Sequence, residues 1–244
     1  MGKENEGLYI NTMRKLSKPI VKLFAYTNMT PNQISLLGLF LDFVAGYLIS
    51  TGQFKLVVIG GIFIQISFVF DLVDGMVARL RGLTSSYGEW ADTIMGDLGS
   101  FAIIFGFGIG GYRQTSEIYV LYLLTIFLMM KHIFTFQPLY TFNLFGYNNY
   151  KKMVIDPILE IFKQSKKDDK NQERKPGLLN IEIEKDGSLG IVINMFTIGA
   201  ITNQLVYTLI CVLIFYLIAI CIMWVGIIRN KNKIISGEYK SETN

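Results

Sequence analysis

The sequence predicts an all-α integral membrane protein with six transmembrane helices, preceded by an amphipathic helix that lies in the membrane interface. Only 17% of the 244 residues are charged, and the mean hydropathy is +0.40. About a quarter of the residues are charged in a typical soluble domain. Residues 205–228 form an uncharged run, longer than the roughly 18 residues that indicate a spanning helix. These features exclude a soluble enzyme, a secreted disulfide scaffold and a disordered tail.

The first predicted element is the amphipathic helix, over residues 8–28. Its Leu, Ile, Val and Phe residues are mixed with Arg14, Lys15, Lys18 and Lys22. This composition is typical of a helix that lies flat in the interface, with its apolar side in the lipid and its charges toward water.

Six apolar blocks follow this helix. Because every backbone group in hydrocarbon must be paired within its own segment, each block predicts a helix. The blocks span residues 33–51, 54–79, 89–112, 117–141, 188–202 and 204–228. The fifth block is short, and Asn203 and Gln204 leave room for only a tight turn before the last helix.

Residues 143–187 form a polar insert, which is Lys-rich and then mixed in charge. This composition favours a solvated loop or small cap over a separate functional module. The predicted organisation is an arm (1–32), transmembrane helices one to four (33–142), a cytoplasmic insert (143–187), transmembrane helices five and six (188–228) and a cytoplasmic tail (229–244).

The 23 Lys and Arg residues predict the orientation. Nearly all of them lie in the arm, the turn at 79–88, the insert and the tail. The opposite side has only Lys55 and Arg113. Since positive residues accumulate on the cytoplasmic side, we expect both termini to face the cytoplasm, in the cell membrane. Outside the insert, no basic stripe with interleaved aromatic residues indicates nucleic-acid binding.

Charged groups inside spans are costly and indicate function. Asp71 and Asp74 are three residues apart and therefore share one face of the second spanning helix. Gly75 and Ala78 keep that face open, and Arg79 is expected to end the helix at the cytoplasmic edge.

Asp92 is expected to lie one turn inside the next helix, which would begin at Gly88, and to converge with Asp71 and Asp74. Three carboxylates would repel one another without a cation. Oxygen ligands select Mg²⁺ or Mn²⁺ over zinc, and two such ions beside Arg79 suit a bound pyrophosphate. The alternative is a set of polar residues that satisfy one another in helix packing.

The chain resembles the CDP-alcohol phosphotransferase family, also called the CDP-alcohol phosphatidyltransferase family. The resemblance covers about residues 8–111 and is carried by the segment TPNQIS at 30–35 and by the pattern Asp71-x-x-Asp74-Gly75-x-x-Ala78-Arg79-x8-Gly88-x-x-x-Asp92. It implies a homodimeric membrane enzyme of phospholipid synthesis, surrounded by membrane lipids. Such an enzyme moves a phosphatidyl-type group from a CDP-linked lipid donor to a hydroxyl of a small alcohol acceptor and releases CMP.

The resemblance also implies roles for single residues. Asp71, Asp74 and Asp92 would be metal ligands. The residues implied in binding the nucleotide are Gly75, Ala78, Arg79, Gly88, Pro31 and Asn32.

One position departs from the family pattern. The family has a fourth aspartate, a metal ligand and base, four residues after the third, and here that position is Gly96. Asp97 is rotated by about 140° from Asp92 in a regular helix and would face the site only through a one-residue π-bulge. Glu89 is a second substitute base. Three readings stay open: an active enzyme with a displaced base, a slow enzyme, and a silent relative that binds CDP-lipid or metal, as the partner of an active subunit.

Weaker signals have two interpretations each. Lys131 forms a buried pair with Asp42, or it binds a phosphate on the acceptor, which would favour a phosphorylated polar alcohol. The glycines at 106–111 match G-x-G-x-x-G, but inside a span they favour close helix packing over a dinucleotide site. A transporter is disfavoured because the acidic cluster lies at the cytoplasmic edge and not at the midplane.

Overall fold

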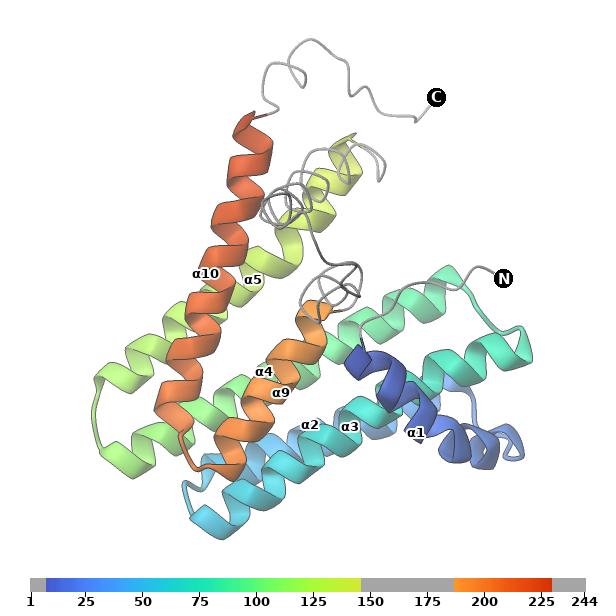
Figure 1. The fold of residues 1–244 in the computed structure, drawn as a ribbon, viewed down its shortest axis with the longest axis horizontal. Coiled ribbons are helices and arrows are strands. Elements are labelled where there is room, and N and C mark those ends of the chain that lie inside the picture. The colour runs from blue at the N-terminus through green and yellow to red at the C-terminus, as the bar shows by residue number, and fades with distance from the viewer. Residues whose placement is uncertain (1–7, 146–186, 230–244) are drawn as a thin grey trace, which may run out of the picture. The chain divides into compact units, whose positions relative to one another are not determined.

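A computed structural model of the chain describes residues 8–145 and 187–229, and these residues form helices joined by short turns (Figure 1). The helices are α1 (Leu8–Ala25), α2 (Pro31–Ser50), α3 (Phe54–Arg81), α4 (Ser86–Thr115), α5 (Tyr119–Phe145), α9 (Gly187–Ile201) and α10 (Leu205–Arg229). Nearly all of the predicted insert and tail lie outside the described residues, so their organisation stays a prediction.

Four helices in the described part of the chain are long and apolar enough to cross a membrane. They are α2, α3, α4 and the Leu205–Val225 part of α10. The apolar stretches Tyr119–Ile133 and Gly190–Ile201 are shorter. The all-helical fold class is therefore confirmed, whereas the count of six spans and the interfacial position of α1 stay predictions.

The turn between α3 and α4 differs from the prediction at both ends. Helix α3 continues past Arg79 to Arg81 and ends where Gly82 takes a positive φ of 66°, a conformation that favours glycine. Helix α4 begins at Ser86 because the Ser85 hydroxyl accepts a hydrogen bond from the Gly88 N–H at 3.1 Å. Asp92 consequently lies about two turns inside α4 and not one.

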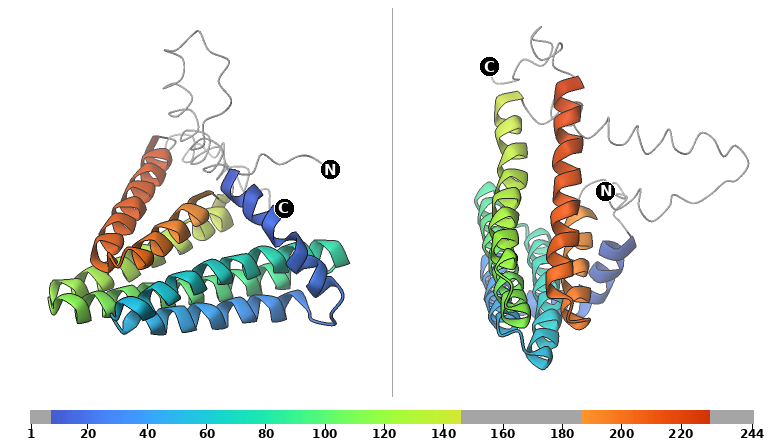
Figure 2. Two further views of the ribbon diagram at one scale, coloured as in Figure 1. Left: turned by 60° about the horizontal axis from the view of Figure 1, so that its bottom comes forward. Right: turned by 90° about the vertical axis from the view of Figure 1, so that its left-hand side faces the viewer.

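The described chain divides into two units. Residues 8–125 and 187–210 belong to one, and residues 126–145 and 211–229 belong to the other. Within the first unit α2 packs along both α3 and α4, while α1 and α9 contact α3 (Figures 1 and 2). Within the second unit the rings of Phe127 and Tyr216 lie 5.5 Å apart between centroids.

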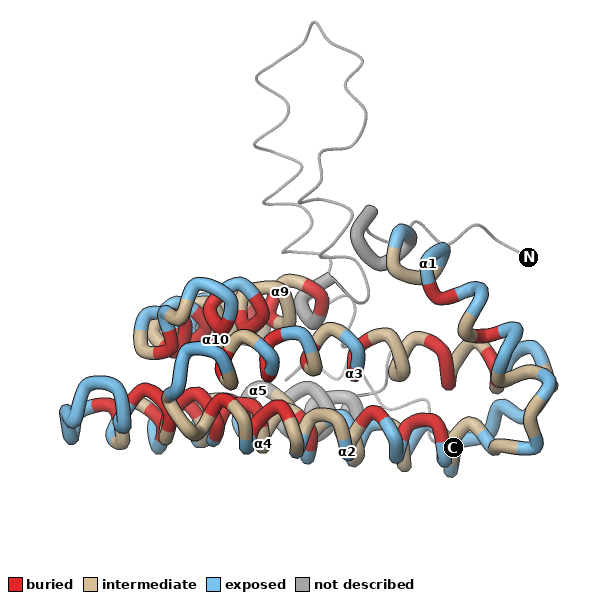
Figure 3. Tube along the Cα trace, turned by 90° about the horizontal axis from the view of Figure 1, so that it is seen from below, coloured by how far each residue is buried: buried red, intermediate tan, exposed pale blue. Residues whose placement is uncertain are grey.

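Small residues bring the backbones of α2 and α4 into contact. A Cβ on Gly46 would meet the carbonyl oxygen of Ala102, and a Cβ on Gly106 would meet the backbone of Gly46. Gly110 lies in the same way against the carbonyl oxygen of Ile49. The glycine-rich segment of α4 therefore packs helices together, as predicted. Buried and exposed positions alternate along α2, α3 and α4 (Figure 3).

An apolar cluster joins the first three helices at one end of this unit. Its buried members are Val21 of α1, Ile34 of α2, and Val73 and Val77 of α3. Because Asp74 lies between the two valines in the sequence, the cluster fixes the part of α3 that carries the acidic residues.

Candidate active site

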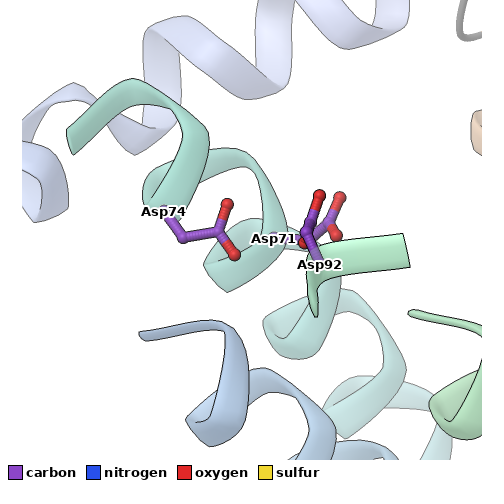
Figure 4. A group of neighbouring side chains, drawn as sticks. All are labelled: Asp71, Asp74 and Asp92. Carbon is purple, nitrogen blue, oxygen red and sulfur yellow. The ribbon is translucent and has the colours of Figure 1, made fainter. Parts of the chain in front are cut away.

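Three carboxylates from α3 and α4, which both pack on α2, converge. Asp71 and Asp74 come from α3 and Asp92 from α4, and one oxygen from each lies within 4.8 Å of the others. Figure 4 shows the side chains of Asp71 and Asp92 next to each other, with the carboxylate of Asp74 directed toward them. Asp74 is buried, with 4% of its surface exposed, whereas the other two are half-buried. The convergence that the sequence predicted is present.

The donor set fits a divalent cation of the magnesium class. Among the described residues this group consists of carboxylates alone, without His or Cys, and hard cations take oxygen ligands. Two oxygens on one Mg²⁺ lie up to about 4.2 Å apart, twice the usual bond of about 2.1 Å. The carboxylate oxygens lie within 4.8 Å of one another, so small side-chain rotations would bring them to the spacing that Mg²⁺ requires. The three aspartates could hold such an ion, and a carboxylate cluster without a cation would be repulsive.

Helix α2 supplies a side chain to this cluster that the sequence did not single out. The Ser35 hydroxyl donates a hydrogen bond to Oδ2 of Asp74, across 39 positions of sequence. Ser35 is itself buried, with 8% of its surface exposed. In the sequence, Ser35 belongs to the TPNQIS segment that resembles the family, but that resemblance assigned no function to Ser35.

Arg79 lies beside the cluster on the same helix. Its guanidinium folds back over Gly75, with both Nη atoms 3.5 Å from the position that a Cβ would take there. The side chain is exposed, so the guanidinium is accessible to an anion. Gly75, over which it folds, directly follows Asp74 and lies about one turn after Asp71. Ala78, one position before Arg79, is half-buried.

The first turns of α2 and α4 lie next to each other. Thr30 caps α2 and forms a capping box with Gln33, and Pro31 occupies the first turn, where its missing N–H costs nothing. This start brings Asn32 to α4, where its Oδ1 lies 3.8 Å from the position of a Cβ on Gly88. Two of the residues implied in nucleotide binding, Asn32 and Gly88, are thus brought together, although they come from different helices.

The substitute bases are not brought to the cluster. Helix α4 runs as a continuous α-helix from Ser86 to Thr115, so this described helix lacks the π-bulge through which Asp97 could turn inward, and the role of Asp97 as a base stays a prediction. Glu89 lies in the first turn of α4 and is exposed. Among the described residues, neither belongs to the group of carboxylates within 4.8 Å of one another. Gly96 is exposed.

Lys131 belongs to the second unit and is buried, with 6% of its surface exposed. Its Nζ donates a hydrogen bond to the Thr135 hydroxyl at 3.1 Å. Asp42 belongs to the first unit, where its carboxylate packs against Gly99 of α4. Both the pairing of Lys131 with Asp42 and its contact with an acceptor stay predictions.

Arg81 is a second residue that the sequence did not single out. Its guanidinium donates hydrogen bonds to the carbonyl oxygens of Phe24, Ala25, Thr27 and Met29, which lie at the end of α1 and in the following loop. Carbonyls at a helix C-terminus lack partners within the helix and attract cations. Arg81 therefore ties the end of α1 to the end of α3, while Arg79, two residues earlier, faces solvent.

Part of the chain is similar to known proteins. The sequence model of the CDP-alcohol phosphatidyltransferase family matches residues 28–156, about half of the chain. The chain is 31% identical over 94 residues to the archaetidylinositol phosphate synthase of Pyrococcus horikoshii. These 94 residues are 38% of this chain and 47% of that protein. The chain is also 31% identical over 94 residues to the bifunctional IPC transferase and DIPP synthase of Aquifex aeolicus. That match includes 38% of this chain and 21% of that protein. The chain thus spans less than half the length of either relative.

Proposed function

Because the chain belongs to the CDP-alcohol phosphatidyltransferase family, we propose that it transfers a phosphatidyl-type group from a CDP-linked lipid to a hydroxyl of a small polar alcohol. The reaction would release CMP and serve phospholipid synthesis. The observation that carries the proposal is the approach of Asp71, Asp74 and Asp92 to within 4.8 Å of one another from two helices. A CDP-lipid would present its diphosphate at the edge of the membrane, where a cation held by these carboxylates would bind it.

The residues around the carboxylates suit a CDP group. The exposed guanidinium of Arg79 would pair with diphosphate oxygens, since arginine binds phosphate through two parallel hydrogen bonds. Gly75 gives that guanidinium its place against α3. Asn32, next to Gly88, supplies an amide that would hydrogen-bond the nucleotide.

The chemistry is a displacement at phosphorus. Mg²⁺ or Mn²⁺, bound as two ions by the three aspartates, would neutralise charge on the diphosphate. The acceptor hydroxyl oxygen forms a bond to the β-phosphorus while the bond from that phosphorus to the CMP oxygen breaks. The hydroxyl proton passes to a base. Asp97 and Glu89 stay the candidate bases, and each would need to move toward the carboxylate cluster to act.

The acceptor is proposed to be a phosphorylated polyol of the inositol phosphate type. The name of the Pyrococcus horikoshii relative, an archaetidylinositol phosphate synthase, supports this class. A buried cation at Lys131 would suit the acceptor's phosphate. We further propose a homodimer in the cell membrane, with the site and both termini on the cytoplasmic side, as the distribution of Lys and Arg favours.

A silent relative is the second candidate function, and the observation that favours it is at Gly96. The residue at the expected position of the base has no side chain, and the continuous α4 helix keeps Asp97 turned away. Such a protein would bind CDP-lipid and metal without turnover and could act as the partner of an active subunit.

Metal-dependent release of CMP by the purified full-length protein in detergent tests the proposal. The assay uses Mg²⁺ or Mn²⁺, a panel of CDP-lipids, and acceptors that include inositol phosphate, glycerol phosphate and serine. Asp92→Asn removes one ligand charge at constant shape. Glu117→Gln is the matched control, because Glu117 is an exposed carboxylate just beyond the other end of α4.

We expect CMP release that requires metal and acceptor, that is lost in Asp92→Asn, and that persists in Glu117→Gln. Binding of CDP-lipid with metal but no release, from well-folded protein, would support the silent relative. A protein that neither binds CDP-lipid nor releases CMP would contradict both functions.

A further inference from the structure

Asp74 is the most buried of the three aspartates, and its orientation depends on a second helix. Its carboxylate oxygen Oδ2 accepts a hydrogen bond from Ser35 of α2, and both side chains are excluded from solvent. An ionised carboxylate has lone pairs for about four hydrogen bonds or metal bonds. One hydrogen bond from Ser35 therefore fixes the carboxylate and still leaves acceptor sites for a cation.

The Ser35 hydroxyl has one proton and two acceptors within reach. The carbonyl oxygen of Pro31 lies 3.2 Å away, in the preceding turn of α2, and the Asp74 carboxylate is the closer partner. Hydrogen bonds to an ionised acceptor are roughly twice as strong as bonds between neutral groups. The proton is therefore directed to Asp74.

Several contacts fix the position of Ser35. The capping box of Thr30 and Gln33 sets where α2 begins, with a hydrogen bond of 2.9 Å from the Thr30 N–H to Oε1 of Gln33. One turn further, the Ser67 hydroxyl of α3 donates to the carbonyl oxygen of Gly38 at 3.0 Å. Helix α2 is thus capped five residues before Ser35 and hydrogen-bonded to α3 three residues after it, so the serine presents its hydroxyl from a fixed stretch of helix.

We propose that Ser35 is a positioning residue for the metal site: its hydroxyl holds the Asp74 carboxylate in the orientation in which it shares a cation with Asp71 and Asp92. The proposal rests on the proposed function, because it needs the three aspartates to bind metal. Groups that orient a ligand in this way typically change metal affinity by about 10- to 100-fold when they are removed. A purely structural serine would change stability alone.

The chain offers a matched control for that distinction. Ser67 is buried in the same α2–α3 interface, with 5% of its surface exposed, and its hydroxyl also bonds α2, but through the Gly38 carbonyl. Ser67→Ala and Ser35→Ala therefore each remove a buried hydroxyl that forms a hydrogen bond across the α2–α3 interface. Only Ser35→Ala deletes a bond to a proposed metal ligand.

The test is a titration of the purified full-length protein in detergent with Mn²⁺ alone, in which the electron paramagnetic resonance signal of free Mn²⁺ reports binding. We expect Ser35→Ala to raise the apparent Kd at least about tenfold and Ser67→Ala to leave it unchanged. Ser35→Thr keeps the hydroxyl and should stay near the wild-type value. Ser35→Cys has nearly the same shape but a weak donor, so it should bind weakly even if Ser35→Ala does not fold.

The outcomes separate this inference from the proposed function. Mn²⁺ binding that Asp92→Asn abolishes, with equal Kd values for the wild type, Ser35→Ala and Ser35→Cys, would overturn the positioning role and leave the metal site intact. If Ser67→Ala lost as much Mn²⁺ affinity as Ser35→Ala, the role of Ser35 would be in helix packing, and the positioning role would be contradicted. A wild-type protein that binds no Mn²⁺ would overturn the metal site and the inference together.

Discussion

A carboxylate added at position 96 should raise turnover. Gly96 lies four residues after Asp92, about 6 Å further along α4 and rotated by only about 40° around it. Within the described residues, nothing outside the local helix lies within 4 Å of the position that a Cβ would take at Gly96. The Gly96→Asp side chain would therefore extend toward the same side as Asp92 without displacing a neighbour.

The expected size of the effect follows from the geometry. No packing is lost, and aspartate is a better helix former than glycine by about 0.3 kcal/mol, so the variant should fold as well as the wild type. A positioned general base contributes about 10²- to 10⁴-fold to a rate. Because Asp97 is turned away by about 140° in the continuous helix, we expect the wild type to lack most of that contribution. We expect Gly96→Asp to raise kcat at least about tenfold.

The assay is CMP release at saturating Mn²⁺, CDP-lipid and acceptor, with Gly96→Ala and Gly96→Asn as controls. The alanine variant adds a Cβ without a functional group, and the asparagine variant adds the same shape without a charge. A folded Gly96→Asp protein with wild-type turnover would refute the reasoning. An equal gain in Gly96→Ala would attribute the effect to helix stiffness and refute it as well.

Three further predictions concern the frame of the site. Arg81→Gln should lower the free energy of unfolding by about 2–3 kcal/mol, through lost charged hydrogen bonds to carbonyls, seen as a lower thermal midpoint. Arg79→Gln, at an exposed position, should leave that midpoint unchanged, and equal shifts would contradict the role of Arg81. Gly106→Leu should abolish monodisperse protein in gel filtration, because its Cβ would overlap the backbone of Gly46; a folded variant would show that α2 and α4 can separate. Mg²⁺ at about 100 times its Kd should stabilise the wild type by about 2.7 kcal/mol, so EDTA should lower its thermal midpoint but not that of Asp71→Asn. An EDTA shift that persists in the variant would place the metal elsewhere.

Local pattern determined much of the site before any packing was known. Asp71 and Asp74 share a face of α3 because a helix places residues three apart on one side, whatever packs against it. Apolar blocks in hydrocarbon have helices as their available form, so the helical fold class also followed from the sequence. The helix ends were less certain, because Ser85 and Gly82 act through capping geometry that apolar periodicity does not report.

Regular helix geometry also predicted which way Asp97 faces. The sequence put Asp97 on the wrong side of an ideal α4 and left a π-bulge as a way to correct it. The continuous helix removes that possibility. That Gly96 takes the place of the fourth aspartate of the family pattern stays a prediction from the sequence.

Tertiary structure alone decided which side chains support the carboxylates. Ser35 meets Asp74 across 39 positions of sequence, Arg81 reaches the loop after α1, and Asn32 reaches Gly88. Each pairing depends on which faces of α2, α3 and α4 meet, and at what height along their axes. That register is set by the fit of small residues such as Gly46 against the backbone of α4. Such a fit is a property of two helices together, so neither helix's own sequence contains it.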